Sequence, residues 1–203
     1  MSDEDAGMLL KEVHHRVKNN LQVICSLLSM QIDQAAGLGC AAALSDAYSR
    51  VMAMSLIHEQ IYQSESLADL DFGEYVEVLS QRLFATYCVD PARVSFEVSV
   101  EPVRLGMARA IPCGLILSEL FSNALKYAFP DGRAGTIRVV LRRLPAGRME
   151  LAVEDNGCGL PADLDWQTTV SLGMQVVRTL SRQLRAEVSV RSGPGGTLFR
   201  FTA

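Results

Sequence analysis

The sequence lacks any apolar run that approaches the roughly 20 residues needed to cross a membrane. Its first residues, Met1-Ser2-Asp3-Glu4-Asp5, are acidic, whereas a secretory signal starts with a basic region that is followed by an apolar one. Internal repeats and low-complexity tracts are also absent. We therefore expect a cytoplasmic protein without a membrane span.

Two further absences narrow the range of partners and cofactors. The chain has 19 Lys and Arg residues against 23 Asp and Glu residues, and this net charge of -4 gives no general attraction to nucleic acid. Its five cysteines are odd in number and widely spaced, without the CxxC pairs or Cys/His clusters that are typical of a metal site. We expect reduced thiols that fill space, and no nucleic-acid partner.

What the chain does contain is enough apolar material for a sizeable core, since 49% of its 203 residues are hydrophobic. Two helical patterns run from about Asp3 to Gln34 and from Ala41 to about Gln63. The short break between them predicts an antiparallel helical hairpin. One hairpin covers little of its own apolar surface, so we expect a homodimer in which two hairpins form a four-helix bundle.

From about residue 67 the pattern changes to mixed helix and strand. The expected helices cover 72–87, a segment with Pro112 in its opening turn that ends near Phe129, and 173–184. The expected strands cover 93–100, 136–144 and 149–153, followed by a hairpin of 187–191 and 197–201. The fold class is therefore α+β, with a helical hairpin domain over residues 1–66 and an α/β sandwich domain over residues 67–203.

His15 stands out because the periodicity of the first helix places it on the solvent-exposed face. An apolar seam recurs along this helix at spacings of three and four residues: Leu10, Val13, Val17, Leu21, Ile24 and Leu28. At roughly 100° per residue, His15 points about 160° from the centre of this seam and His14 only about 60°. Glu12 and Asn19 share the outward face of His15. A neutral imidazole can accept a phosphoryl group, whereas an isolated exposed histidine usually does nothing.

A second group of polar residues follows Pro112. Glu119, Asn123 and Lys126 cluster on one side of a helix, opposite its apolar side. The strand that ends in Asp155 leads into a turn bounded by Gly157 and Gly159, where a carboxylate can accept a hydrogen bond from an exocyclic amine and the backbone can approach a flat ring. Further on, SLG precedes a helix whose free amides can hold phosphate oxygens, and GPGGT supplies another close turn.

These motifs resemble those of a known family. ELFSNALKYAFP, DNGCGLP, SLGMQVV and GPGGT resemble the asparagine box and the glycine boxes of the Bergerat ATP-binding fold of histidine kinases, gyrase and Hsp90-type chaperones. LLKEVHHRVKNNLQVICSLLSMQ is similar to the phosphoacceptor helix of the histidine kinase subfamily in which Arg and later Asn follow the histidine. Together the motifs cover nearly the whole chain, which therefore resembles the core of a two-component sensor histidine kinase.

The resemblance implies a role for each matching residue. His15 takes the γ-phosphoryl group of ATP, with Glu119 as a further catalytic residue, and Asn19 matches an amide that supports phosphatase chemistry. Asn123 ligates Mg²⁺ through its side-chain oxygen. The nucleotide is held by residues that contact its phosphates or its base: Lys126 and Gly173 for phosphate, and Asp155, Gly157, Gly159 and Thr197 for adenine. Residues 161–172 form a short lid. The implied partner is the receiver domain of a response regulator.

The sequence departs from the common family pattern in three ways. The lid is short and lacks the usual phenylalanine box. Arg16 occupies the position after the phosphoacceptor, where an acidic residue is usual, so Glu12 becomes the candidate to orient or deprotonate the imidazole. The two domains use up the chain without a sensor, so we expect the input to come from a separate sensor protein, or the sequence to be a fragment. Arg138, Arg142 and Arg143 are interpreted as a solvated edge of the sheet.

Two other functions compete with a kinase. One is a phosphotransfer hub whose ATPase-like domain is non-catalytic, but such a module has no physical need for the full nucleotide-binding set. The other is a different Bergerat ATPase, such as a serine kinase of the anti-sigma type or a chaperone-like clamp, and it leaves the His15 face unexplained. Measured affinity for ATP separates the first of these from a kinase.

Overall fold

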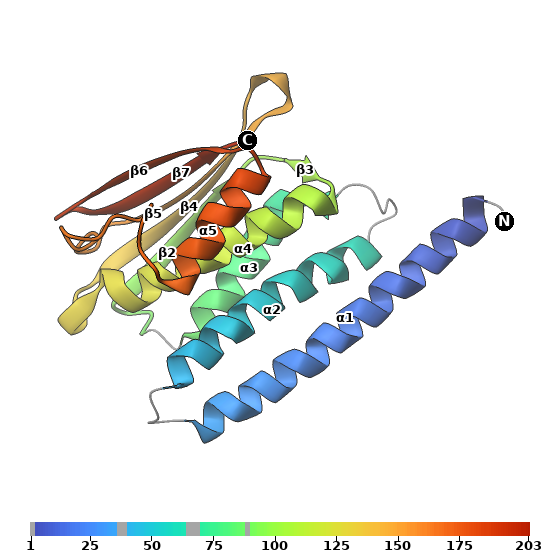
Figure 1. Cartoon of the computed structure of the whole chain (residues 1–203), viewed down its shortest axis with the longest axis horizontal. Coiled ribbons are helices and arrows are strands. Elements are labelled where there is room, and N and C mark those ends of the chain that lie inside the picture. The colour runs from blue at the N-terminus through green and yellow to red at the C-terminus, as the bar shows by residue number, and fades with distance from the viewer. Residues whose placement is uncertain (1–2, 36–39, 64–69, 88–89) are drawn as a thin grey trace.

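Two long antiparallel helices, α1 (Asp3–Gln34) and α2 (Ala41–Gln63), form the N-terminal part of the computed structural model (Figure 1). The structure describes residues 3–35, 40–63, 70–87 and 90–203, and side chains within 12–35, 40–61, 70–87 and 90–203. Both helices have the bounds that the sequence predicts. No helix within these ranges is long and apolar enough to cross a membrane.

The face of α1 that packs on α2 differs from the predicted seam. His14 is buried, and Val17 and Leu21 are partly buried, as the seam predicts for its flank and its centre. Val13 and Ile24, however, remain 46% and 43% exposed. One antiparallel partner covers only about one side of a helix, so the packed face is rotated toward His14 and the remaining apolar residues of α1 stay exposed. Leu10 lies outside the described side chains.

The second part of the chain is a five-stranded sheet with helices on one face (Figure 1). Its strands are β2 (Val94–Val100), β4 (Gly135–Arg143), β5 (Met149–Asp155), β6 (Glu187–Gly193) and β7 (Gly196–Thr202). They lie in the order β2-β4-β5-β7-β6, with β2 and β4 parallel and the other neighbours antiparallel. The covering helices are α3 (Phe72–Thr86), α4 (Met107–Asn123) and α5 (Leu172–Gln183). A two-stranded sheet joins β1 (Leu70–Asp71) to β3 (Arg104–Leu105).

The α4 helix begins earlier than the sequence predicts. It starts at Met107, directly after Gly106, so Pro112 lies inside the helix and not in its opening turn. Proline removes one hydrogen bond of the helix. The loss is tolerated here because Pro112 and its neighbours Cys113 and Ile116 are buried in the core. Directly after Asn123 the helix widens into a π-helical turn, Ala124–Ala128, a feature that often accompanies functional sites.

The sheet separates an apolar inner face from a charged outer face. On β4 the buried Ile137, Val139 and Leu141 alternate with Arg138 and Arg142. The sequence suggests that these arginines mark an edge of the sheet. They do not, because β4 lies between β2 and β5. They lie on the open face of the sheet, where Arg138 pairs with the carboxylates of both neighbouring strands, Glu97 at 3.2 Å and Glu154 at 3.6 Å. The nucleotide-site candidates lie on the helix-covered side of this sheet and at its strand ends.

The α2 helix lies between α1 and the helices of the second part (Figure 1). Its buried residues Met52, Leu56 and Ile57 join the core of that part. The hydroxyl of Tyr75, a fully buried residue of α3, donates to the backbone oxygen of Ala53 at 3.0 Å. The hairpin and the sheet domain therefore share one apolar core through α2.

Candidate functional site

His15 lies on the side of α1 that Asn19 also occupies. The helical periodicity predicts that the His15 side chain is fully exposed, but the structure shows it partly buried. Asn19 Nδ2 lies 3.5 Å from His15 Nδ1, one helical turn away, which is the spacing that brings residues i and i+4 together. The carboxamide of Asn19 can therefore set which ring nitrogen of His15 carries the proton in the neutral form.

Glu12, the candidate base, is engaged by the neighbouring arginine. Arg16 Nε donates to Glu12 Oε1 at 2.8 Å across one turn of α1. This hydrogen bond and the charge of Arg16 lower the pKa of the Glu12 carboxyl, with His15 as a further cause in the same direction. A carboxylate with a lowered pKa is a weaker proton acceptor, so the geometry favours Glu12 as a charge near the imidazole over Glu12 as a base.

His14 points the other way and packs against α2. It is 8% exposed, and its Nδ1 lies 3.2 Å from Nδ1 of His58, with the two ring centroids 5.3 Å apart. Burial lowers the pKa of His58, and the neighbouring His14 lowers it further. At this distance one ring nitrogen donates and the other accepts. The two adjacent histidines of α1 therefore differ in environment as the sequence predicts, with His14 in a packing position.

Asp155 ends the central strand β5 and is fixed by two backbone amides. Gly157 and Thr197 donate to the same oxygen, Oδ1, at 2.9 and 3.3 Å. Burial raises the pKa of Asp155, and these two hydrogen bonds oppose that shift. Three predicted residues thus meet at one carboxylate, because β7 pairs with β5 in the register that sets Thr197 beside Asp155.

The glycine turns lie against backbone that leaves no room for a side chain. A Cβ on Gly157 would be 2.3 Å from the carbonyl oxygen of Ala128, and one on Gly159 would be 2.2 Å from that of Gly193. Gly159 has a φ of +80° and Gly196 one of +118°, conformations that favour glycine. The two glycine-rich segments therefore close on each other, and Gly157 lies against the π-helical turn that follows α4.

Glu119 and Asn123 on α4 face the first turn of α5. A Cβ on Gly173 would be 2.7 Å from Glu119 Oε2 and 3.9 Å from Asn123 Nδ2. The asparagine box and the predicted phosphate-binding helix are thus brought together, with oxygen donors of the type that a hard cation prefers. Glu119 is only 4% exposed. Groups of three or more His, Cys, Asp or Glu side chains that fit a metal are absent from the described residues.

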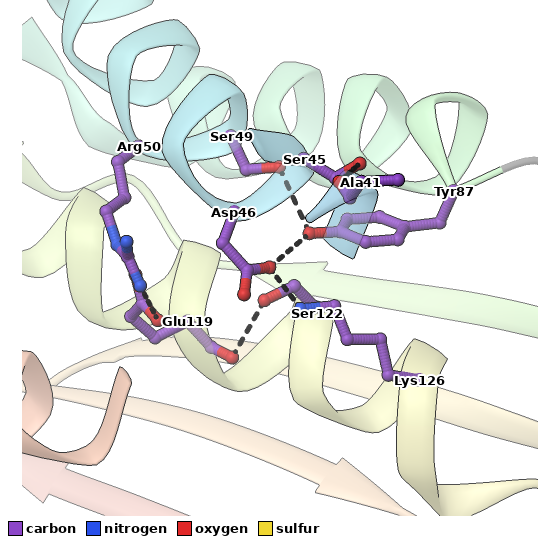
Figure 2. Close-up of polar contacts among 9 residues, drawn as sticks. All are labelled: Ala41, Ser45, Asp46, Ser49, Arg50, Tyr87, Glu119, Ser122 and Lys126. Carbon is purple, nitrogen blue, oxygen red and sulfur yellow. Dashed lines mark hydrogen bonds and ion pairs between the residues drawn. The ribbon is translucent and has the colours of Figure 1, made fainter. Parts of the chain in front are cut away.

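Lys126 and Glu119 both pair with α2. Arg50 donates to Glu119 Oε1 at 2.5 Å and to Oε2 at 3.0 Å, and Asp46 accepts from Lys126. Figure 2 shows Asp46 and Arg50 pointing from α2 toward the α4 segment, which consists of α4 and the π-helical turn that follows it. Tyr87 also contacts this group, since its hydroxyl donates to Asp46 at 3.1 Å. Burial raises the pKa of Tyr87 to about 12.

The predicted lid is tied to α5. The Arg178 guanidinium donates to the backbone oxygens of Trp166 and Thr169 at 2.7 and 2.9 Å, and Gln175 Nε2 donates to that of Val170 at 2.8 Å. The ring of Trp166 packs edge-on against the core residue Phe199, with centroids 5.9 Å apart. Trp166 therefore covers the protein's own core.

Sequence reasoning assigned no role to four polar residues that hold the site, of which three lie outside its motifs and Asn156 lies inside the DNGCGLP motif. These residues are Asp46, Arg50, Asn156 and Arg178. Asn156 Oδ1 accepts from the Thr136 amide at 2.7 Å and so ties the glycine turn to β4. Asp46 and Arg50 are four residues apart on one helix, a weak signal that by itself indicates only a solvated face.

Family models match two parts of the chain. A model described as "Histidine kinase" matches residues 12–87, and one described as "Histidine kinase-, DNA gyrase B-, and HSP90-like ATPase" matches residues 109–203. The first match contains the His15 face and the α2 residues. The second contains the predicted nucleotide-binding residues.

Two relatives are similar over most of the chain. Blue-light-activated histidine kinase 2 of Erythrobacter litoralis is 30% identical over 193 residues, which are 93% of this chain and 55% of that protein. Sensor histidine kinase PdtaS of Mycobacterium tuberculosis is 31% identical over 189 residues, 90% of this chain and 36% of that protein. The chain therefore spans about half or less of these curated relatives.

The solved histidine kinase domain of the Erythrobacter litoralis blue-light activated histidine kinase EL346 has a similar structure. The TM-score is 0.73 at 26% identity, and the match covers 98% of this chain and 93% of that one. The Acinetobacter baumannii histidine kinase AdeS matches at 18% identity with a TM-score of 0.55, which indicates a shared fold.

Proposed function

The chain belongs to the histidine kinases, as the core of a two-component sensor histidine kinase, and we propose that it transfers the γ-phosphoryl group of ATP to His15 and then to an aspartate of a response regulator receiver domain. The observation that carries this proposal is the convergence of Gly157 and Thr197 on Asp155, in a chain that also holds His15 beside Asn19. A relay hub without catalysis does not need the first arrangement. A different Bergerat ATPase does not need the second.

We divide the chain at about residue 66. Residues 1–66 form the dimerisation and phosphotransfer hairpin, and residues 67–203 form the catalytic ATP-binding domain. The end of α2 at Gln63 and the start of β1 at Leu70 support this division.

The nucleotide roles follow from which atoms are already engaged. Both backbone amides at Asp155 donate to Oδ1, so we assign Oδ2 to the exocyclic amine of adenine. Thr197 assists through water, and Gly157 and Gly159 form the floor beneath the base. The backbone packed against each of them leaves room for glycine alone. The buried setting of Asp155 makes a hydrogen bond to the base stronger than it would be in water.

The phosphate end of the nucleotide lies, in this proposal, between α4 and α5. Gly173 lies in the first turn of α5, whose free amides face the phosphates, and Lys126 contributes a positive charge. The side-chain oxygen of Asn123 is the Mg²⁺ ligand, and the cation offsets the negative charge of the phosphates. Glu119 acts as a catalytic carboxylate on the same helix face, next to Gly173.

The attacking group is the imidazole of His15. Phosphoryl transfer forms a bond between an imidazole nitrogen and the γ-phosphorus and breaks the bond from that phosphorus to the leaving ADP oxygen. We assign the attack to Nε2, the ring nitrogen that Asn19 does not contact. The assignment requires the Asn19 carboxamide to turn from its present placement, with Nδ2 toward Nδ1, so that Oδ1 accepts from Nδ1–H and leaves a lone pair on Nε2.

The exposed apolar face of α1 supports assembly into a homodimer. This face consists of Val13, Val23, Ile24, Leu27 and Met30, which are 43% to 59% exposed. An amphipathic helix that exposes such a row on the side away from its hairpin partner can bury it against a second copy. The resulting four-helix bundle is the proposed dimer, and a separate sensor protein remains a proposed source of input.

The proposed function is tested by comparing the two adjacent histidines. We expect His15→Ala to abolish acid-labile autophosphorylation by ATP and Mg²⁺, because it removes the nucleophile. His14→Ala should retain much of it, since His14 packs against His58 and does not share the face of Asn19. Equal labelling of wild type and His15→Ala would refute the assignment.

A further inference from the structure

Two ion pairs of opposite polarity connect α2 to the α4 segment. The Arg50 guanidinium donates to both oxygens of Glu119, and Lys126 pairs with Asp46 (Figure 2). The side chains are largely withdrawn from water, with exposed fractions of 6% for Glu119 and 15% for Lys126. Such pairs are screened by salt and solvent less than surface pairs are. The α2 helix therefore fixes the charged ends of Glu119 and Lys126.

The arrangement around Asp46 shows that this contact involves three elements. Asp46 and Arg50 lie one turn apart and so face α4 together. The Tyr87 hydroxyl, at the end of α3, donates to Asp46 at 3.1 Å and lies 3.3 Å from Ser49 Oγ. Lys126 Nζ also lies 5.5 Å from the centre of the Tyr87 ring. Asp46 is thus held between an ammonium and a phenol.

Both α4-segment partners are residues with a proposed role toward the nucleotide. While Asp46 accepts from Lys126, a phosphate oxygen must compete with that carboxylate for the ammonium. While Arg50 occupies both oxygens of Glu119, that carboxylate has to break a charged hydrogen bond before it can contact a reacting group. His15 lies on α1, so these contacts come from the hairpin helix that does not carry the phosphoacceptor.

We propose that Asp46 and Arg50 are positioning residues that compete with Mg²⁺-ATP for Lys126 and Glu119, so that the placement of α2 sets the nucleotide affinity of the site. This inference rests on the proposed nucleotide site. Coupling between two binding events is reciprocal, so nucleotide that displaces Asp46 must weaken the attachment of α2 by the same factor. A change in the hairpin would then be transmitted to the ATP site without any change in the nucleotide-binding motifs.

The test measures Mg²⁺-ATP affinity of the full chain by calorimetry. Asp46→Asn keeps the shape of the side chain but removes its charge, and we expect the dissociation constant to fall about tenfold, within the usual range of coupling between sites. Asp46→Glu keeps the charge and should bind as weakly as wild type. Glu59→Gln is the matched control, because it makes the same charge change on α2 but removes pairs to Lys18 and Arg82. Its affinity should stay at the wild-type value.

A second variant and a salt series separate direct competition from a loosened fold. Arg50→Lys keeps one positive charge but loses the two parallel bonds to Glu119, and it should also bind Mg²⁺-ATP more tightly than wild type. The advantage of Asp46→Asn over wild type should shrink modestly as salt is raised, because salt screens this partly buried ion pair less than it screens a surface pair.

Three outcomes would overturn the inference. Unchanged or weaker binding by both Asp46→Asn and Arg50→Lys, with wild type binding normally, would overturn it and leave the proposed function intact. Equal tightening by Glu59→Gln would show that any loosening of the hairpin suffices, which contradicts direct competition. Failure of wild type and every variant to bind Mg²⁺-ATP would overturn the nucleotide site and this inference together.

Discussion

At the residue scale, the neighbours of Asp155 fix the orientation of its carboxylate. Its Oδ1 accepts two amides that come from different glycine-rich segments, so its orientation is set by the backbone before any base is bound. The sequence predicts this residue, because its strand end and glycine-bounded turn stand in order with three further elements of the nucleotide site. It does not predict that one oxygen satisfies both amides, since that depends on the register between β5 and β7.

The Asp155→Asn variant tests the adenine assignment. The side-chain oxygen of asparagine can still accept from Gly157 and Thr197, so the turn should keep its structure. Its second polar atom becomes a donor and opposes the exocyclic amine, which leaves buried groups unpaired and costs about 1–3 kcal/mol. We expect ATP affinity to fall by roughly tenfold to a hundredfold in calorimetry. Glu154→Gln, beside it on the exposed face of the strand, is the control; wild-type affinity in Asp155→Asn would place adenine elsewhere.

His58 predicts a pH dependence of stability. Burial lowers its pKa in the folded state, with His14 3.2 Å away on the facing helix. As the pH falls below the ordinary histidine pKa of about 6.5, the unfolded chain therefore binds more protons than the folded chain. The stability that comes from keeping His58 neutral is complete above about pH 6.5 and is lost as the pH falls below it. Between about pH 7 and pH 5.5, the melting temperature of wild type should fall more steeply than that of His58→Gln. Parallel melting curves over this range would contradict the prediction.

At the scale of elements, the sequence predicts long periodic helices and strands bounded by turn residues. It predicts less well where some helices begin and where very short strands form. The bounds of α1 and α2 follow from a clear apolar period and a glycine-containing break. The start of α4 does not, because Pro112 reads as a first-turn residue although the helix begins at Met107. Burial in the core outweighs the local preference of proline here. The short strands β1 and β3 carry too few residues for any periodicity.

The apolar face of α1 predicts an effect on assembly. Val23 and Leu27 are 59% and 56% exposed and lie one turn apart, so both would be buried in a four-helix bundle. We expect the full chain to be a dimer by light scattering at micromolar concentration. Val23→Lys with Leu27→Lys should shift it to monomer, because charges would be buried without partners. A wild-type monomer under these conditions would contradict the proposed dimer.

At the scale of the whole molecule, the contact between α2 and α4 lies beyond sequence reasoning. Arg50 and Glu119 are 69 residues apart, and Asp46 and Lys126 are 80 apart. Each of the four residues reads by itself as part of a polar helix face. Only the packing of α2 on the core through Leu56 and Ile57 turns these faces toward each other. The motifs therefore predict what the site binds, while the fold determines which hairpin residues reach it.

The central claim, that this chain phosphorylates itself on His15 from ATP, is tested most directly by mapping the modified residue. Wild-type protein incubated with labelled ATP and Mg²⁺ should acquire label that is lost in acid and retained in base, as expected for a phosphoimidazole. Peptide mapping should place it on His15 and not on His14 or His58. Acid-stable label on a serine or threonine, or nucleotide binding without any label on His15, would contradict the account.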